Sequence, residues 1–259
     1  MNEAIMTMKK RLEIDLNIEL SDLEKVPHAI SNPRIESLAS MIDHTLLKPE
    51  VEKDQYMPIF EEARMYHFHS VCIPPNRVEM AKKEMKDDPV KICTVIGFPL
   101  GYGTMNTKVF EAKDCIRLGA DEIDMVMNIS ALKSCDYPYV WNEIKAVKEA
   151  AGREILLKVI IETALLEEVE KYAAGWLVKS AGADFVKTST GFASEGAKIE
   201  DVRLLKSIAG RDLGVKASGG IKDQKKAVEM IRAGATRLGV SSSVAIVQNK
   251  KKGPSNQSY

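Results

Sequence analysis

The sequence predicts an α/β protein of the (β/α)8 TIM barrel class with an N-terminal helical extension. From residue 41 onward, eight short apolar segments alternate with longer amphipathic segments. Strands that alternate with helices favour a parallel sheet, and closing that sheet into a barrel leaves no strand edge exposed. The length of 259 residues fits one such domain, because α/β barrels of this size fold as a single unit. A doubly wound open sheet is the structural alternative.

The first 40 residues are expected to form two helical pieces, separated in the region from Pro27 to Pro33. Four residues at helical spacing predict an apolar face on the first piece: Ile5, Met8, Leu12 and Leu16. We expect residues 1–40 to cap the main domain, either by covering the barrel bottom or by mediating assembly.

Eight strands are predicted at 41–47, 69–73, 91–97, 122–128, 155–161, 184–189, 213–217 and 236–240. Three short turns, at 119–121, 182–184 and 234–236, each begin with glycine, follow a helical pattern and precede a strand. A glycine in the left-handed region commonly ends a helix, so these turns support repeated αβ units. The catalytic barrel is expected over 41–248, and the polar residues 249–259 are expected to form a flexible C-terminal tail.

Composition excludes several classes of partner. Lys plus Arg and Asp plus Glu both number 37, so no net charge draws the chain to nucleic acid or to an anionic membrane. Cys72, Cys93, Cys115 and Cys135 form no Cys-x-x-Cys pair and have no histidine at zinc spacing. Without a secretory signal they indicate reduced thiols in the cytoplasm, and no apolar run is long enough to span a bilayer. We expect no metal and no cofactor.

Charged residues inside the predicted strands point to chemistry. Lys187 and Lys216 lie in successive apolar strands, and lysine is rarely buried without a partner, because removing water from an ammonium costs several kcal/mol. Lys158, Asp124 and Asp43 occupy comparable positions. We expect all five inside the barrel near its C-terminal mouth, where barrel enzymes place their active sites. A buried lattice of ion pairs, or side chains that reach outward between the helices, is the structural alternative.

Three lysines against two aspartates suggest a reaction at an amine. A lysine becomes nucleophilic when it is neutral, and a second cation together with burial lowers the pKa of an amine from about 10.4 towards neutrality. Such an amine condenses with a carbonyl to give an iminium, which serves as an electron sink for an adjacent carbon–carbon bond. Asp124 is expected to carry protons, through an ordered water, during these steps.

Small residues at the ends of the last strands form a second candidate site: Gly191, Gly219, Gly220, Gly239, Ser241 and Ser242. Barrels often bind phosphate with the loops after strands seven and eight and with a helix N-terminus. Around Gly219, Gly220, Gly239 and the Ser241–Ser242 helix start, we expect backbone N–H groups to bind the anion in a geometry that leaves no room for side chains. Ordinary tight turns and a helix cap would explain the same residues. Thr190, Asp43 and Lys158 are also expected to bind substrate. His44, His67 and His69 are expected to be surface or packing residues.

Five motifs resemble deoxyribose-phosphate aldolase in the same order along the chain: Ile-Asp-His-Thr-Leu-Leu (42–47), Gly-Ala-Asp-Glu-Ile-Asp-Met-Val (119–126), Leu-Lys-Val-Ile-Ile-Glu-Thr (157–163), Lys-Thr-Ser-Thr-Gly-Phe (187–192) and Val-Lys-Ala-Ser-Gly-Gly-Ile (215–221). The resemblance implies a class I, metal-free aldolase that interconverts 2-deoxy-D-ribose 5-phosphate with D-glyceraldehyde 3-phosphate and acetaldehyde. It makes Lys187 the Schiff-base lysine, Lys216 the neighbour that lowers its pKa, and Asp124 the proton-transfer acid. It also implies a homodimer.

One departure concerns the phosphate. Some family members carry a lysine directly after Thr-Ser-Thr-Gly, whereas this chain has Phe192, so a basic phosphate contact is missing. Two other functions remain open from the residues alone. A phosphosugar isomerase would need a carboxylate base over the substrate carbon, and a non-catalytic phosphosugar-binding protein would need no nucleophile. The proximity expected for Lys187 and Lys216 argues against both.

Overall fold

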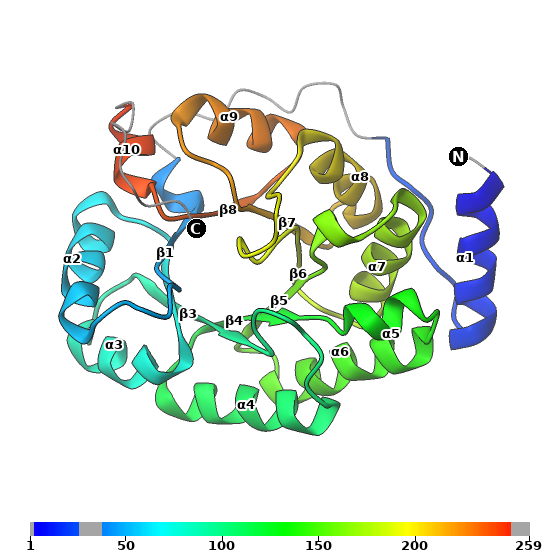
Figure 1. The fold of residues 1–259 in the computed structure, drawn as a ribbon, viewed down its shortest axis with the longest axis horizontal. Helices are drawn as coiled ribbons and strands as arrows, with labels where there is room; N and C mark the ends of the chain where they lie inside the picture. Colours follow the sequence, from blue (N-terminus) through cyan, green and yellow to red (C-terminus); the bar gives the residue numbers. More distant parts are fainter. Residues whose placement is uncertain (1–2, 26–37, 250–259) are drawn as a thin grey trace.

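The computed structural model describes residues 3–25 and 38–249, which build a closed barrel surrounded by helices (Figure 1). Eight parallel strands pair in chain order, and β1 closes onto β8. The strands are β1 (Ile42–Thr45), β2 (Ser70–Ile73), β3 (Lys91–Ile96), β4 (Glu122–Val126), β5 (Leu156–Ile160), β6 (Phe185–Lys187), β7 (Gly214–Ser218) and β8 (Arg237–Val240). All eight lie within the predicted segments to within a residue or two, so the barrel is confirmed and the open sheet is wrong.

Helices follow the strands and pack on the outside of the barrel (Figure 1). They are α2 (Tyr56–Tyr66), α3 (Val78–Glu84), α4 (Met105–Leu118), α5 (Ile129–Lys133), α6 (Tyr137–Ala151), α7 (Glu168–Ser180), α8 (Ile199–Ala209), α9 (Gln224–Ala233) and α10 (Ser243–Val247). Short 3-10 turns occupy Ala39–Met41, Lys53–Gln55, Pro75–Arg77 and Thr163–Leu165. Within residues 3–25 and 38–249, no helix combines the length and the apolar character needed to cross a membrane.

Local sequence explains where the helices begin and end. Thr104 begins α4 by accepting a hydrogen bond from the Thr107 N–H, and Asp223 begins α9 in the same way. Side-chain oxygens at this position satisfy N–H groups that the first turn leaves without a helical partner. The predicted glycine stop is confirmed at Gly119, which ends α4 with φ of 110°, a conformation that glycine adopts without steric cost.

The N-terminal extension lies along the outside of the barrel. Helix α1 (Glu3–Leu16) packs against α6 and α7 and buries Ile5 and Leu12, as its apolar face predicts (Figure 1). Beyond it, Trp176 Nε1 on α7 donates to the Ser21 carbonyl at 3.2 Å. The described part of the extension therefore covers outer helices, and it reaches the C-terminal end of α8, where the Glu24 N–H donates to the Ser207 carbonyl at 2.7 Å. The second expected helical piece falls largely on 26–37, and the expected tail on 250–259; both ranges are outside the described residues.

Strand register brings the charged residues together inside the barrel. Lys187 is paired with Lys216 across β6 and β7, and Asp124 is paired with Lys158 across β4 and β5. Side chains alternate along a strand, so paired positions point to the same face of the sheet. The sheet thus places these four side chains in one region of the interior, while the apolar residues of the strands pack against the helices.

Candidate active site

Asp124 is the centre of the buried polar cluster. Its Oδ2 atom lies 2.7 Å from Lys187 Nζ and 2.7 Å from Lys216 Nζ, and its Oδ1 atom lies 2.9 Å from Lys158 Nζ. All four side chains are almost completely buried. Two ammonium groups therefore share one carboxylate oxygen, which confirms that the predicted lysines and aspartate meet in one place.

Asp43 also joins this cluster, as predicted. Its Oδ2 atom lies 2.5 Å from Lys216 Nζ and 3.8 Å from Lys158 Nζ. Its Oδ1 atom accepts a hydrogen bond from Arg237 at 2.8 Å. Asp43 is fully buried on β1, and its ion pairs are with protein cations, so in this structure it holds Lys216 together with Asp124.

Sequence reasoning missed two members of the cluster, Glu122 and Arg237. Glu122 Oε2 lies 2.6 Å from Lys158 Nζ and 2.9 Å from Arg237. Glu122 Oε1 lies 2.9 Å from His69 Nε2, so His69, expected to be a surface or packing residue, contacts the network at its bottom. The alternation of side chains could have found Glu122, because it lies two residues before Asp124 on β4 and shares its face. Arg237 was harder to identify from the sequence, because it is the first residue of its strand and does not interrupt an apolar run.

Electrostatics keep the cluster charged. Burial alone would raise the pKa of Asp124, but Lys158, Lys187 and Lys216 together hold it well below its usual range. Burial alone would lower the pKa of Lys216, but Asp124 and Asp43 outweigh it and raise that pKa above its ordinary value. Lys216 therefore stays an ammonium at neutral pH, and Asp124 stays a carboxylate.

Lys187 differs from the other two lysines in position and in partners. It is the last residue of β6, at the C-terminal end of the barrel, whereas Lys158 and Lys216 lie in mid-strand. Within the described part of the chain, its ion pairing involves Asp124 alone, while Lys216 pairs with two carboxylates and Lys158 with three. Lys187 is thus the lysine that is held least tightly and lies nearest to the mouth.

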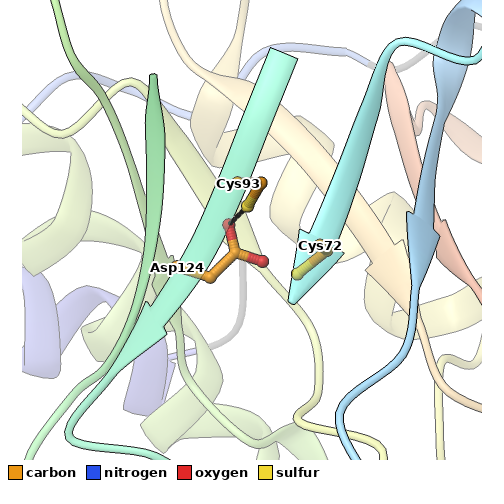
Figure 2. Close-up of side chains that lie close together, drawn as sticks. All are labelled: Cys72, Cys93 and Asp124. Atoms are coloured by element: carbon orange, nitrogen blue, oxygen red, sulfur yellow. Dashed lines mark hydrogen bonds between the residues drawn. The ribbon is translucent and has the colours of Figure 1, made fainter. Parts of the chain in front are cut away.

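Two thiols lie beside Asp124. Figure 2 shows Cys72 on β2 and Cys93 on β3 beside the carboxylate, and Cys93 Sγ donates to Asp124 Oδ1 at 3.3 Å. The three side chains present ligand atoms within 4.8 Å of one another, a spacing that a metal ion could bridge. The Lys158 ammonium already contacts Cys93 Sγ at 3.3 Å and Asp124 Oδ1 at 2.9 Å. Here the positive charge beside these atoms is supplied by lysine. Cys72 is fully buried.

The turn after Lys187 is tied to both neighbouring strands. The N–H of Thr188 donates to the Lys216 carbonyl at 3.0 Å, and Ser218 Oγ donates to the Ser189 carbonyl at 2.5 Å. On the other side, the N–H of Thr190 donates to Glu162 at 3.2 Å, and its hydroxyl also donates to Glu162. Glu162 follows β5 and was a further residue that the sequence analysis assigned no role.

The predicted glycines differ in how crowded they are. A Cβ on Gly219 would lie 2.9 Å from the Gly196 Cα, and a Cβ on Gly239 would lie 3.0 Å from Lys216 Cε. Around Gly191 and Gly220 nothing lies within 4 Å of such a Cβ, but φ is 89° and 73°. The expectation that no side chain has room is therefore wrong at Gly220. There, as at Gly191, the left-handed backbone is what favours glycine.

Gly239 and the two serines occupy different surroundings. Gly239 pairs with Asp43 and faces the stem of Lys216, so it lies beside the buried cluster. Ser241 and Ser242 line a cavity of about 290 Å³ at the start of α10, together with His44 and Glu62. His44 bridges Glu62 and Ser243, at 2.7 and 2.8 Å, which agrees with its expected packing role.

Comparisons with known proteins agree with this geometry. The sequence pattern of the DeoC/LacD family aldolases matches residues 37–249. A deoxyribose-phosphate aldolase of Clostridium perfringens is 55% identical over 215 residues, which cover 83% of this chain and 96% of the relative. A Coccidioides immitis crystal structure assigned as a deoxyribose-phosphate aldolase superposes with a TM-score of 0.86 at 37% identity, covering 96% of this chain and 97% of that one.

A third relative, the deoxyribose phosphate aldolase of Aeropyrum pernix, has a tetrameric structure. It superposes with a TM-score of 0.77 at 35% identity and covers 83% of this chain and 91% of its own. The family pattern spans the whole barrel, including every strand that carries a member of the polar cluster. The chain therefore belongs to the deoxyribose-phosphate aldolases, within the DeoC/LacD family of class I aldolases.

Proposed function

We propose that the chain cleaves 2-deoxy-D-ribose 5-phosphate reversibly into D-glyceraldehyde 3-phosphate and acetaldehyde through a Schiff base on Lys187. The observation that carries this proposal is the pair of lysines that share Asp124 Oδ2, each at 2.7 Å. One of them ends its strand at the mouth, and the other is held as an ammonium by two carboxylates. A nucleophilic amine beside a fixed cation is the arrangement that imine chemistry needs.

The first half of the reaction forms the iminium. Lys187 Nζ adds to the aldehyde carbon C1 of the open-chain sugar, and the resulting carbinolamine loses its oxygen as water. Asp124 is assigned the proton transfers between the reacting nitrogen, the departing hydroxyl and Lys216. Burial acts to raise the pKa of Asp124, but its lysine neighbours outweigh burial and hold that pKa below the usual range. Asp124 therefore holds a proton only briefly before it passes the proton on.

The second half breaks the carbon–carbon bond. The C3 hydroxyl gives its proton, through an ordered water, to the Asp124 carboxylate. C3 becomes the aldehyde of glyceraldehyde 3-phosphate, and the C2–C3 electron pair moves into the iminium to give an enamine. The same proton is returned to C2, and water hydrolyses the new iminium, which releases acetaldehyde and restores the Lys187 amine. Each of these steps creates or removes positive charge at one nitrogen, and the adjacent carboxylate of Asp124 moderates that change.

Phosphate binding is proposed at the opposite end of the substrate, around Gly191, Gly219, Gly220 and the Ser241–Ser242 turn. Thr190, which was also expected to bind substrate, is not included, because its N–H and its hydroxyl both donate to Glu162. Support comes from Gly219 and Gly220, which follow β7 directly with φ of 81° and 73°, since consecutive left-handed residues can turn N–H groups towards an anion. Gly220→Val should raise KM for the phosphorylated sugar and spare unphosphorylated 2-deoxyribose. Equal slowing of both substrates would place the phosphate elsewhere.

An isomerase is less well supported. Asp43, Asp124 and Glu122 are the carboxylates of the cluster. Burial acts to raise their pKa values, but the surrounding cations outweigh it and leave all three lowered. A carboxylate with a lowered pKa is a weak base for removing a proton from carbon.

Assembly and location are proposed as well. A homodimer is proposed by analogy with the family, although the Aeropyrum pernix relative is tetrameric. A cytoplasmic location is proposed because Cys72, Cys93, Cys115 and Cys135 are free thiols, which reducing compartments maintain.

The direct test is turnover of 2-deoxyribose 5-phosphate, followed by coupling the released acetaldehyde to an alcohol dehydrogenase and recording NADH consumption. Lys187→Ala should abolish the signal while circular dichroism stays unchanged. Lys148→Ala is the matched control, because Lys148 also forms an ion pair, at 2.6 Å with Asp184, but lies on α6 at the outer side of the barrel. Equal loss in both variants would argue against the assignment.

A further inference from the structure

Glu162 has an unusual backbone for its residue type. Its φ and ψ are 50° and 68°, in the left-handed region, which is costly for a residue with a long side chain. Only 3% of the residue is exposed. It directly follows the end of β5, two residues beyond Ile160, which is paired with Lys187. A strained and buried carboxylate at the mouth is therefore maintained by its surroundings.

The side chain holds the turn that follows Lys187. Both carboxylate oxygens accept from the Thr190 N–H, at 3.2 and 3.3 Å, and Oε2 also accepts from the Thr190 hydroxyl. The same hydroxyl oxygen accepts from the Phe192 N–H at 3.0 Å. Glu162, Thr190 and Phe192 thus form one hydrogen-bonded chain, and this chain fixes the five residues after the reactive lysine.

The backbone on either side reinforces this connection. Ile161 N–H donates to the Lys187 carbonyl at 3.0 Å, and Thr163 N–H donates to the Thr188 carbonyl at 2.9 Å. Glu162 lies between these two bonds. Its left-handed conformation interrupts the strand pairing at the residue whose carboxylate contacts Thr190. The backbone strain therefore occurs at the residue that makes this contact.

The carboxylate is also in electrostatic contact with the reactive lysine. Burial raises the pKa of Glu162 above its ordinary value, while the hydrogen bonds from Thr190 and the charge of Lys187 act in the opposite direction. An ionised Glu162 is therefore a net cost to folding at neutral pH, because an unfolded glutamate ionises more readily. A residue whose backbone conformation and ionised side chain both destabilise the folded state is a candidate for a role in function.

We propose that Glu162 is a positioning residue, whose carboxylate fixes the turn after Lys187 and thereby aligns the imine nitrogen with the substrate. This inference rests on the proposed function. The pairing explains why the turn needs a glutamate. Thr190 presents two donors towards β5, and a carboxylate is the side chain that accepts both without offering a competing donor. The negative charge also interacts with the charge of Lys187, on which the iminium cation forms.

Three variants test the role. Glu162→Gln keeps the shape and removes the charge, Glu162→Gly removes the side chain where the backbone suits glycine, and Thr190→Val removes the hydroxyl that links Glu162 to Phe192. We expect each to lower kcat for 2-deoxyribose 5-phosphate by about tenfold or more, because misalignment of reacting groups is costly to rate. The double variant Glu162→Gln/Thr190→Val should lose no more than the poorer single variant, since both changes break one chain of contacts.

Measurements of Tm distinguish a positioning role of Glu162 from a purely structural one. At pH 7.5, Glu162→Gln should have a Tm at least as high as the original chain, because the ionised carboxylate of an acid with a raised pKa destabilises the folded state above its ordinary pKa. Asp87→Gly is the control for removing left-handed backbone strain, since Asp87 is an exposed residue with φ of 64°. It should leave kcat unchanged.

The outcomes are distinguishable. If the original chain is active and Glu162→Gln or Glu162→Gly keeps its kcat, the positioning role is wrong. A lower Tm with unchanged kcat in the Glu162 variants would make Glu162 a structural residue. Additive losses of kcat in the double variant would contradict the proposal that Glu162 acts through Thr190. If the original chain neither turns over the sugar nor forms a borohydride adduct, the proposed function fails first, and the positioning role fails with it.

Discussion

Asp124→Asn isolates the charge at the centre of the cluster. Asparagine has the same shape as aspartate, so the substitution keeps the packing while it removes the negative charge and replaces one acceptor oxygen with an NH2 donor. Ion pairs within 4.0 Å connect four cations, Lys158, Lys187, Lys216 and Arg237, to three carboxylates, Asp43, Glu122 and Asp124. The variant leaves the same four cations with two carboxylates in a region that water does not reach.

The size of the effect follows from burial and contacts. Removing one partner from a buried ion pair typically costs about 3–5 kcal/mol, and Asp124 is fully buried and contacts three ammonium groups at 2.7 to 2.9 Å. This is a large part of the roughly 5–15 kcal/mol that stabilises a typical domain. For a chain of this length it corresponds to a drop in Tm of roughly 6–20 °C. Activity should fall below detection, because the shared proton acceptor is lost.

A compensating variant separates stability from chemistry. In Asp124→Asn/Lys158→Met one excess cation is removed, so part of the lost stability should return while activity stays absent. Differential scanning calorimetry gives Tm, and the coupled acetaldehyde assay gives kcat. The reasoning is refuted if Asp124→Asn melts within about 2 °C of the original chain, or if the double variant is less stable than the single one.

Three other predictions address separate parts of the site. Lys216→Leu should lower kcat by about a hundredfold or more, because the ammonium 2.7 Å from the shared Asp124 oxygen is removed; a kcat within about threefold of the original would remove Lys216 from the mechanism. Phe192→Lys should lower KM for the phosphorylated sugar but not for 2-deoxyribose, since a charge-assisted contact becomes possible. Phe192 is 44% exposed and contacts Phe98 edge to face at 5.3 Å, and equal KM changes for both sugars would contradict a phosphate contact. Burial acts against ionisation of Glu122, but Lys158, His69 and Arg237 lower its pKa from 4.5 to about 2, so its stabilising contribution is present above pH 4.5 and lost as pH falls towards 2. Urea unfolding at a series of pH values should show a smaller acid loss in Glu122→Gln, and an equal loss would contradict this.

The charged strand residues could be predicted from sequence because burial of charge is costly. Lys187, Lys216, Lys158, Asp124 and Asp43 each interrupt an apolar strand, and such interruptions need a partner. Parallel pairing then brings them together, because paired residues share a face. Strand positions and the barrel itself followed from the same alternation of apolar and amphipathic segments.

Other features depend on tertiary structure that sequence periodicity does not encode. Arg237 sits at a strand beginning, where charged residues are also common for reasons of exposure, so only the closed barrel shows that it faces inward. Glu122 also begins its strand, and the one sequence signal for it was the face that it shares with Asp124. Glu162 follows a strand in a left-handed conformation that its residue type does not predict. The position of α1 against α6 and α7 depends on which outer helices leave an apolar face uncovered.

Chemical trapping of the imine tests the central claim most directly. The original chain is incubated with acetaldehyde, reduced with borohydride and digested, and the modified peptide is located by tandem mass spectrometry. We predict one modified residue, Lys187, which gains an ethyl group, and no modification in the Lys187→Ala variant. An ethyl group on Lys216 or Lys158, or none on any lysine while the chain turns over 2-deoxyribose 5-phosphate, would contradict the account.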